Sequence, residues 1–373
     1  MDKVYGNILI FNPFGIGDVI FSTPLVKAIK NAYPASTVTY ICNKRGCCVL
    51  EHNPKVDKII IYEKDDFRKI AGRSRILFLR EFVRFIKTVK AADADLMIDL
   101  SLNHQASLAA KLMGIKRRIG FNFRDRGKFL TEKIELDGFD DKHVILYYLD
   151  VLKLIGINTE GLYPEAFTSD EQDEWAGRFF KENRIVDKQV IGIVPGGGKS
   201  WGADARYRRW PIAHFAHTVD KIIDRFGVSV LLFGDRTERK ICENMKRLMK
   251  NNVINTGGQT NIGQFMALAK RCKLILCNEG GPLHIAVALG TPTVSIFGPV
   301  DENVYGPYSE REDMNLIVRD RSKCRPCYSR FKHTKCALVE CLNAISVDNV
   351  FAAVKTLLER LGINEKNITK TSR

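Results

Sequence analysis

The stretch from Cys277 to Gly298 constrains the fold most, because it packs two buried strands and a helix into a short segment. The apolar runs 273–277 and 293–297 predict strands, and the run 283–289 predicts the helix between them. Strands that alternate with helices in this way are typical of a parallel α/β sheet.

The turn between the first of these strands and the helix carries the residues of a phosphate site. Gly280 and Gly281 let the backbone approach a ligand, and the helix behind them offers unpaired N–H groups and a positive dipole end. Glu279 would repel a phosphate, so we expect it to bind ribose or sugar hydroxyls; the alternative is that it only caps the helix. His284 either contacts the same ligand or makes a buried polar contact.

The same alternation runs through the 373 residues twice, which suits two domains. The first set predicts strands at 7–11, 38–42, 58–62, 95–100 and 118–121 and helices at 19–32, 74–91, 104–113 and 142–155. After a linker at 158–168, the second set predicts a helix at 170–183, strands at 190–194, 228–233 and 253–255, and helices at 236–249 and 261–271. We therefore expect an α/β fold with two Rossmann-like, doubly wound domains, 1–165 and 166–345, that face a cleft, followed by a segment at 346–373.

The charge of the chain predicts an anionic partner. The net charge is +15, and residues 64–128 hold 16 lysines and arginines against 7 acidic residues. In this region Arg117, Arg118 and Arg124 are interleaved with phenylalanines, a mixture that suits nucleic acid or a phosphorylated lipid. The alternative is a set of solvated helix faces.

The glycine-containing loop at 12–18 follows the first strand. Gly15 and Gly17 are not followed by a third glycine, and Asn43 stands where a dinucleotide-binding fold places an acid, so the loop lacks that fingerprint. Asp18 lies near a helix N-terminus at the carboxyl end of the strand, where open α/β sheets bind ligands. It is either a helix cap or a general base.

Ten cysteines, without a membrane-spanning apolar run or a signal-like N-terminus, predict a cytoplasmic protein with reduced thiols or a metal site. Four of them follow the pattern C-x2-C-x8-C-x4-C, namely Cys324, Cys327, Cys336 and Cys341. Four thiolates this close are typical of a structural zinc or iron site. The alternatives are reduced cysteines in a surface loop and a disulfide formed on purification.

Three motifs in order resemble family 9 glycosyltransferases, the bacterial heptosyltransferases of lipopolysaccharide core assembly. They are residues 12–18 with 22–25, Pro195-Gly196-Gly197 with 208–211, and 278–284 with 297–299. The resemblance implies a GT-B fold, an acceptor bound by the N-terminal domain, a nucleotide-sugar donor bound by the C-terminal domain, and inversion without a catalytic metal. It also implies that the last helix, at 347–361, packs back on the first domain.

The resemblance and the chemistry together assign roles to residues. Inverting transfer needs a base for the acceptor hydroxyl and cationic or N–H groups for the departing diphosphate. We expect Asp18 to be the catalytic base. The donor-binding residues are expected to be Pro195, Gly196, Gly197, Arg208, Glu279, Gly280, Gly281 and His284, and the acceptor-binding residues Gly15, Gly17, Arg117, Arg118 and Arg124.

The expected donor is ADP-heptose, and the expected acceptor is an anionic glycolipid of the lipopolysaccharide core, met at the inner face of the bacterial inner membrane by a peripherally bound enzyme. No cofactor is expected for catalysis, and no nucleic acid as partner. Many relatives carry Asp where this chain has Glu279 and Lys where it has Arg208, which leaves another donor or a protein acceptor open. Two rival classes are a nucleic-acid-binding protein and a nucleotide-sugar epimerase or dehydrogenase; the latter would need a better dinucleotide fingerprint.

Overall fold

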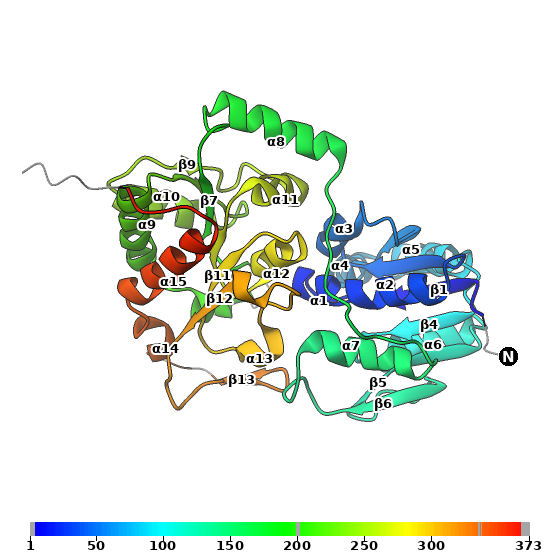
Figure 1. Ribbon diagram of the computed structural model, residues 1–373. Helices are drawn as coiled ribbons and strands as arrows, with labels where there is room; N and C mark the ends of the chain where they lie inside the picture. The colour runs from blue at the N-terminus through cyan, green and yellow to red at the C-terminus, as the bar shows by residue number, and fades with distance from the viewer. Residues whose placement is uncertain (1–3, 199–201, 335, 337, 367–373) are drawn as a thin grey trace, which may run out of the picture. The chain divides into compact units, whose positions relative to one another are not determined.

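The computed structural model describes residues 4–198, 202–334, 336 and 338–366. The chain divides into two compact units, Met1–Phe167 and Thr168–Arg373, and this division falls at the end of the segment expected to be a linker. None of the helices in the described residues is both long enough and apolar enough to cross a membrane. Figure 1 shows a parallel sheet with helices on both faces in each unit.

The sheet of the first unit has the strand order β3-β2-β1-β4-β5-β6, and all its neighbours are parallel. This is the Rossmann order. The first three strands are added toward one side of β1 and the next three toward the other, so the switch point lies between β1 and β4. The strands are β1 (Asn7–Phe11), β2 (Thr37–Cys42), β3 (Lys58–Ile61), β4 (Leu96–Asp99), β5 (Arg117–Phe123) and β6 (Glu132–Leu136).

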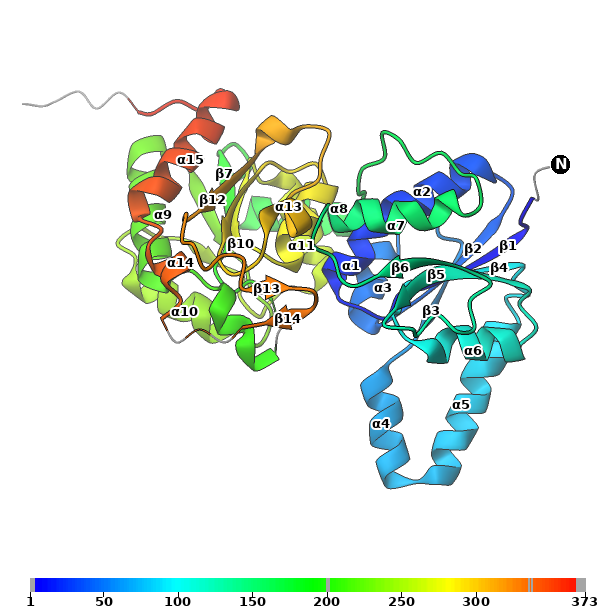
Figure 2. The same cartoon turned by 90° about the horizontal axis from the view of Figure 1, so that it is seen from below.

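Helices of the first unit cover both faces of this sheet, and a helical hairpin projects from it (Figure 2). They are α1 (Ile16–Phe21), α2 (Thr23–Ala32), α3 (Lys44–Leu50), α4 (Lys64–Arg73), α5 (Arg75–Lys90), α6 (His104–Leu112) and α7 (Val144–Lys153). The helix predicted at 19–32 is two helices that meet at Ser22, because Pro24 lacks an N–H group and fits the first turn of a new helix.

The second unit repeats the same topology. Its sheet has the order β12-β11-β10-β7-β8-β9, and all neighbours are again parallel. The switch point of this sheet lies between β7 and β10. The strands are β7 (Val190–Val194), β8 (Ser229–Leu232), β9 (Ile254–Asn255), β10 (Ile275–Asn278), β11 (Thr293–Phe297) and β12 (Asn315–Arg319). A separate hairpin pairs β13 (Tyr328–Ser329) with β14 (Lys332–His333).

Apolar side chains fill both faces of this second sheet. Ile191 and Ile193 of β7 belong to one apolar cluster, whereas Val190 and Val194 belong to another, as expected for a strand whose alternate side chains point to opposite faces. The helices are α8 (Asp170–Glu182), η1 (Gly202–Arg208, 3-10), α9 (Ile212–Phe226), α10 (Arg239–Leu248), α11 (Ile262–Arg271), α12 (Gly281–Ala288), α13 (Glu302–Tyr305), η2 (Glu312–Met314, 3-10), α14 (Glu340–Asn343) and α15 (Val347–Arg360).

The last long helix, α15, packs within the second unit. It contacts α9, β11 and β12, and its buried residues Val350, Val354 and Leu358 join an apolar cluster of that unit. Ser346 caps its N-terminus by accepting a hydrogen bond from the N–H of Asn349. This buried face therefore belongs to the core of the second unit, and the packing of the helix on the first domain stays a prediction.

Candidate active site

The glycine-containing loops of the second unit come together at the centre of its sheet. β7 and β10 are neighbours, and the loops that follow them lie at the same edge because parallel strands end together. Asn278, fully buried at the end of β10, donates from Nδ2 to the carbonyl oxygen of Pro195 at 2.8 Å and accepts from the N–H of Trp210 at 2.9 Å. One amide thus joins the loop after β7 to the segment before α9.

The backbones of Gly197 and Gly280 approach each other closely at this edge. Gly280 has φ +147° and Gly197 has φ +80°, both in the range that favours glycine. A Cβ atom at Gly280 would overlap the carbonyl oxygen of Gly197. α12 begins directly after Gly280, so the first N–H groups of this helix lie at the switch point of the sheet, where they favour an anion.

Arg208 and Glu279 form a buried ion pair beside these glycines. Nε of Arg208 donates to Oε2 of Glu279 at 2.5 Å, and Nη2 donates to Oε1 and to the backbone oxygen of Glu279. The residues are 6% and 5% exposed, so each charge depends on the other for compensation. Glu279 was expected either to bind hydroxyls or to cap α12; its carboxylate accepts from Arg208, and α12 has no side-chain cap at Gly280.

Glu238 is a site residue that the sequence analysis missed. It is 3% exposed, accepts from the N–H of Gly198 at 2.8 Å and of Asp235 at 3.2 Å, and its burial raises the pKa of its carboxyl group. A Cβ atom at Gly196 would overlap this carboxylate. Arg209 lies in the same place and donates from Nε to the carbonyl oxygen of Gly196 at 2.6 Å. The available signal was an acid after the second strand of a Rossmann unit, the position that commonly binds ribose.

His284 lies in the first turn of α12 and is buried. The edge of the second sheet thus brings together every residue expected to bind the donor: Pro195, Gly196, Gly197, Arg208, Glu279, Gly280, Gly281 and His284. It contains cationic, carboxylate and N–H groups in a region closed to water on one side by the sheet. This chemistry suits a nucleoside diphosphate better than an apolar ligand.

The loop after β1 places Asp18 at the corresponding edge of the first unit. Oδ2 of Asp18 accepts from the N–H of Gly15 at 3.1 Å, so its carboxylate binds an N–H group at the start of α1. Asn43 caps α3 and donates from Nδ2 to the carbonyl oxygens of Pro13 and Phe14. Asn43 stands where a dinucleotide-binding fold has a ribose-binding acid, and here its side chain holds the loop after β1 in place.

Asp99 ends β4, the neighbour of β1, and was also missed. It is 4% exposed, and burial raises the pKa of its carboxyl group to about 6. Its Oδ1 accepts from the N–H of Ser101 at 2.9 Å. The first unit therefore has two carboxylates, Asp18 and Asp99, near the switch point of its sheet.

Arg117 and Arg118 have internal partners. Arg117 donates to both carboxylate oxygens of Glu132, to the hydroxyl of Tyr5 and to the carbonyl oxygen of Leu154. Arg118 donates to the carbonyl oxygens of Phe129, Ile115 and Lys116. These contacts join β5 to neighbouring segments. Both guanidinium groups therefore make hydrogen bonds within the first unit.

Arg124 is exposed in the loop after β5, with its guanidinium 4.8 Å from the ring centroid of Phe123. Of the three arginines expected to bind the acceptor, it is the one whose side chain faces solvent.

The four-cysteine segment packs against the end of β11 through a neighbouring arginine. Arg325 donates to the carbonyl oxygens of Gly298, Asp320 and Val300 and to Glu302. Cys324, Cys327, Cys336 and Cys341 are free thiols, and burial raises the pKa of Cys341 to about 11. Among the described residues, no three His, Cys, Asp or Glu side chains are arranged to hold a metal ion.

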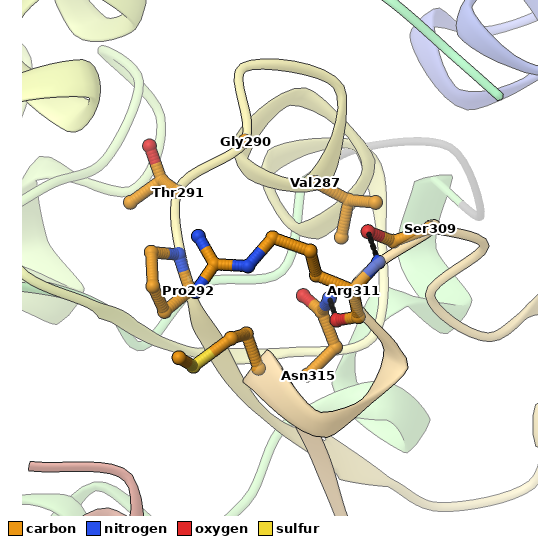
Figure 3. A pocket seen from close by; sticks show the side chains of 8 residues that line it. Val287, Gly290, Thr291, Pro292, Ser309, Arg311 and Asn315 are labelled. Atoms are coloured by element: carbon orange, nitrogen blue, oxygen red, sulfur yellow. Dashed lines mark hydrogen bonds between the residues drawn. The ribbon is translucent and has the colours of Figure 1, made fainter. Parts of the chain in front are cut away.

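A small hollow also lies at the opposite edge of the second sheet, around the starts of β11 and β12 (Figure 3). The side chain of Arg311 extends across it toward Thr291 and Pro292. Asn315 donates from Nδ2 to the carbonyl oxygen of Arg311 at 3.0 Å. Because it lies at the amino ends of the strands, this hollow is separate from the glycine loops.

Two Rossmann-like units, with polar loops at the carboxyl ends of their central strands, define the GT-B class of glycosyltransferases. The model of glycosyltransferase family 9 (heptosyltransferase) matches residues 82–337. The chain therefore belongs to this family and is a glycosyltransferase.

Individual relatives agree with this assignment. The chain is 22% identical over 348 residues to "Lipopolysaccharide heptosyltransferase 3" of Escherichia coli (strain K12), covering 92% of this chain and 95% of that one. The structure of a family 9 glycosyl transferase from Veillonella parvula matches with TM-score 0.80 and 24% identity, covering 96% and 99% of the two chains. The structure of E. coli "ADP-heptose lps heptosyltransferase II" matches with TM-score 0.75 and 20% identity, covering 95% and 99%.

Proposed function

We propose that the protein transfers a heptose from ADP-heptose to an anionic glycolipid acceptor of the lipopolysaccharide core, with inversion and without a catalytic metal. The observation that carries this proposal is the switch-point site of the second unit. There the N-terminus of α12 and the Gly197–Gly280 approach lie beside the buried pair of Arg208 and Glu279. The names of the relatives supply the heptose, the ADP and the lipopolysaccharide acceptor.

In this proposal the diphosphate of the donor binds at the N-terminus of α12. The glycines leave room for it, and the N–H groups and the helix dipole stabilise its charge. Arg208 supplies a fixed cation, which Glu279 holds in one orientation through two hydrogen bonds. Glu238 follows β8, where Rossmann folds bind ribose, so the proposal assigns ribose contacts to Glu238 as well as to Glu279.

The chemical step is attack of an acceptor hydroxyl oxygen on the anomeric carbon of the heptose. The bond from that carbon to the diphosphate oxygen breaks as the new glycosidic bond forms, and ADP leaves with the electron pair. Asp18 takes the proton of the hydroxyl as a general base. Arg208 and the N–H groups of α12 stabilise the negative charge that develops on the diphosphate.

The class of acceptor implies where in the cell the enzyme acts. A lipid-linked acceptor is presented at a bilayer surface, and the net charge of +15 suits the anionic cytoplasmic leaflet of the inner membrane. We propose peripheral association with that leaflet. The resemblance is to enzymes that act on lipopolysaccharide, and the charged groups of the second unit need no nucleic acid to explain them.

A structural metal at the four cysteines stays a prediction. Three of the thiols are at least partly accessible. Burial raises the pKa of Cys327 and of Cys341, and neighbouring cysteines raise both further. Metal binding would require the thiols to rotate into one ligand set and lose their protons. The proposed chemistry uses none of them.

A panel of ADP-, UDP-, GDP- and CMP-linked sugars tests the donor assignment. A ligand that binds only the native state raises the melting temperature, and at equal concentration the tighter ligand raises it more. The proposal predicts the largest increase with ADP-heptose and a smaller one with ADP alone. A larger increase with a UDP-, GDP- or CMP-sugar would contradict ADP-heptose as the donor.

A further inference from the structure

α4 and α5 form a helical hairpin that projects from the sheet of the first unit (Figure 2). No residue of α4 is buried, and Val89 is the one buried residue of α5. The two helices are held together by aromatic rings, because Phe67 of α4 lies 6.3, 6.4 and 5.8 Å from Phe78, Phe82 and Phe85 of α5. The aromatic face of α5 therefore has its partner in α4.

Three aliphatic residues of α5 lie on a second face. Ile76, Leu79 and Val83 are 84%, 60% and 42% exposed, and their spacing of three and four residues places them on one side of the helix. Twelve large apolar side chains are exposed in the described part of the chain, and four of them belong to α5. Such clustering marks an interaction surface, whereas scattered exposed residues would need no explanation.

Basic side chains border this exposed stripe. Residues 64–90 hold nine lysines and arginines against three acidic residues. Arg80, Arg84 and Lys87 are exposed, and their positions on the helix place them along one edge of the stripe. A helix with aliphatic residues on one face and cationic residues beside them suits the interface of an anionic bilayer.

We propose that this face of α5 docks the enzyme on an anionic lipid bilayer. Ile76, Leu79 and Val83 enter the boundary between headgroups and acyl chains, and Arg80, Arg84 and Lys87 contact lipid phosphates. The proposal rests on the proposed function in one respect, because a lipid-linked acceptor requires the enzyme to work at a bilayer. A bilayer fits better than nucleic acid, which has no use for an aliphatic stripe, and the projecting face offers a helix rather than a groove for a peptide.

Co-sedimentation of the full chain with phosphatidylcholine vesicles, with and without phosphatidylglycerol, tests the docking face. The wild-type chain should bind the anionic vesicles, release them as salt rises, and bind neutral vesicles weakly. Ile76→Ser/Leu79→Ser/Val83→Ser should weaken binding at least ~10-fold. Arg80→Gln/Arg84→Gln/Lys87→Gln should weaken it about 100-fold, which is roughly fivefold for each charge.

Matched controls use residues of the same kinds elsewhere. Leu112→Ser removes an apolar side chain that is 80% exposed at the end of α6. Lys181→Gln/Lys188→Gln/Lys246→Gln removes three exposed charges from the second unit. The Leu112→Ser variant should bind vesicles like the wild type. The fold loss of vesicle affinity in the lysine variant should be less than a tenth of that in the α5 charge variant.

The proposal is overturned if the wild-type chain does not bind anionic vesicles, or if either α5 variant binds them as tightly as its control. It is also overturned if the α5 charge variant loses single-stranded RNA binding while vesicle binding is unchanged. Titration of the same variants with ADP keeps the two proposals separate: α5 variants should bind ADP normally. A wild-type chain that binds vesicles through α5 but binds no ADP would refute the proposed donor and leave the docking face standing.

Discussion

Arg208 and Glu279, 71 residues apart in the sequence, form a two-point ion pair in the interior of the second unit. The pair joins the end of η1 to the start of α12. A buried pair of this kind adds little stability over an apolar pair of similar volume, but breaking it leaves an uncompensated charge. A role in ligand binding therefore explains the pair better than a role in folding.

The first prediction separates these two roles. Arg208→Met should lower the free energy of unfolding by about 3–5 kcal/mol, because Glu279 is left buried and unpaired. Arg208→Met/Glu279→Leu should recover most of that loss but still fail to bind ADP. All three tryptophans lie in the second unit, so urea unfolding followed by tryptophan fluorescence reports on this unit.

The control for that experiment is the exposed pair of Arg239 and Glu243, whose side chains are 68% and 41% exposed. Arg239→Met should cost no more than about 1 kcal/mol and leave ADP binding intact. A double variant at Arg208 and Glu279 that binds ADP like the wild type would remove both residues from the donor site.

A second prediction concerns the glycine at the start of α12. Gly280→Ala should abolish measurable ADP binding, because the added Cβ displaces the loop that contains Gly197. Gly290→Ala is the matched control: Gly290 also has positive φ, +74°, but a Cβ there meets open space. The control should lose about 1 kcal/mol of stability and keep its ADP affinity. Calorimetric titration of both variants with ADP decides the matter, and equal affinities would show that the close approach is irrelevant to the donor.

The third prediction tests the base. In Asp18→Asn the amide oxygen can still accept from the N–H of Gly15, so the melting temperature should stay near that of the wild type. The transfer rate should fall by roughly 10²–10⁴, with donor affinity unchanged. Near-normal transfer by a folded Asp18→Asn enzyme would assign Asp18 to helix capping alone.

The fourth prediction follows from the raised pKa of Asp99, about 6 against an ordinary value of about 3.9. Between these values the folded state holds a proton that the unfolded state has released, so the stability contributed by Asp99 is present at low pH and is lost as pH rises toward 6. Asp99→Asn should remove this dependence. Its stability relative to the wild type should therefore be higher at pH 8 than at pH 4, by up to about 3 kcal/mol.

Calorimetric unfolding at the two pH values measures this difference. Asp125→Asn, at an exposed position in the same unit, provides the control and should show no such gain. If Asp99→Asn and the wild type respond to pH alike, the carboxyl group of Asp99 is ionised in the fold at neutral pH without cost.

The fifth prediction concerns the cysteines. Protein purified under reducing conditions without chelator should contain about one equivalent of zinc or iron per chain. Cys324→Ser/Cys327→Ser should lose that metal and keep ADP binding, because the thiols take no part in the proposed chemistry. Elemental analysis that finds less than a tenth of an equivalent would show that the segment is held by contacts such as those of Arg325 with the end of β11.

Much of the fold could be predicted because its strands are buried on both faces. Runs such as 190–194 and 293–297 are mostly apolar, and each proved to be a fully buried interior strand of a parallel sheet. β6 and α4 escaped prediction for the opposite reason. β6 reads EKIEL and α4 reads KDDFRKIAGR, so neither has the apolar content on which periodicity depends.

The site could be predicted only in part, since sequence motifs identify residues but not their partners. The glycines after β7 and β10, which the sequence assigned to one donor site, lie at one sheet edge because the two strands are parallel neighbours. The pairing of Arg208 with Glu279 joins positions far apart and depends on the path of η1. Arg117 and Arg118 show the converse: a basic cluster in the sequence became a set of structural contacts with Glu132 and backbone oxygens.

The most direct test of the account is the transfer reaction itself. The purified full chain is incubated with ADP-heptose and a heptose-deficient lipopolysaccharide core acceptor, and ADP release is measured together with the mass and anomeric configuration of the product. The account predicts ADP release that depends on the acceptor, a product one heptose heavier with inverted configuration, and no requirement for added divalent metal. Transfer from a different nucleotide sugar, or no acceptor-dependent release of ADP by the folded protein, would contradict it.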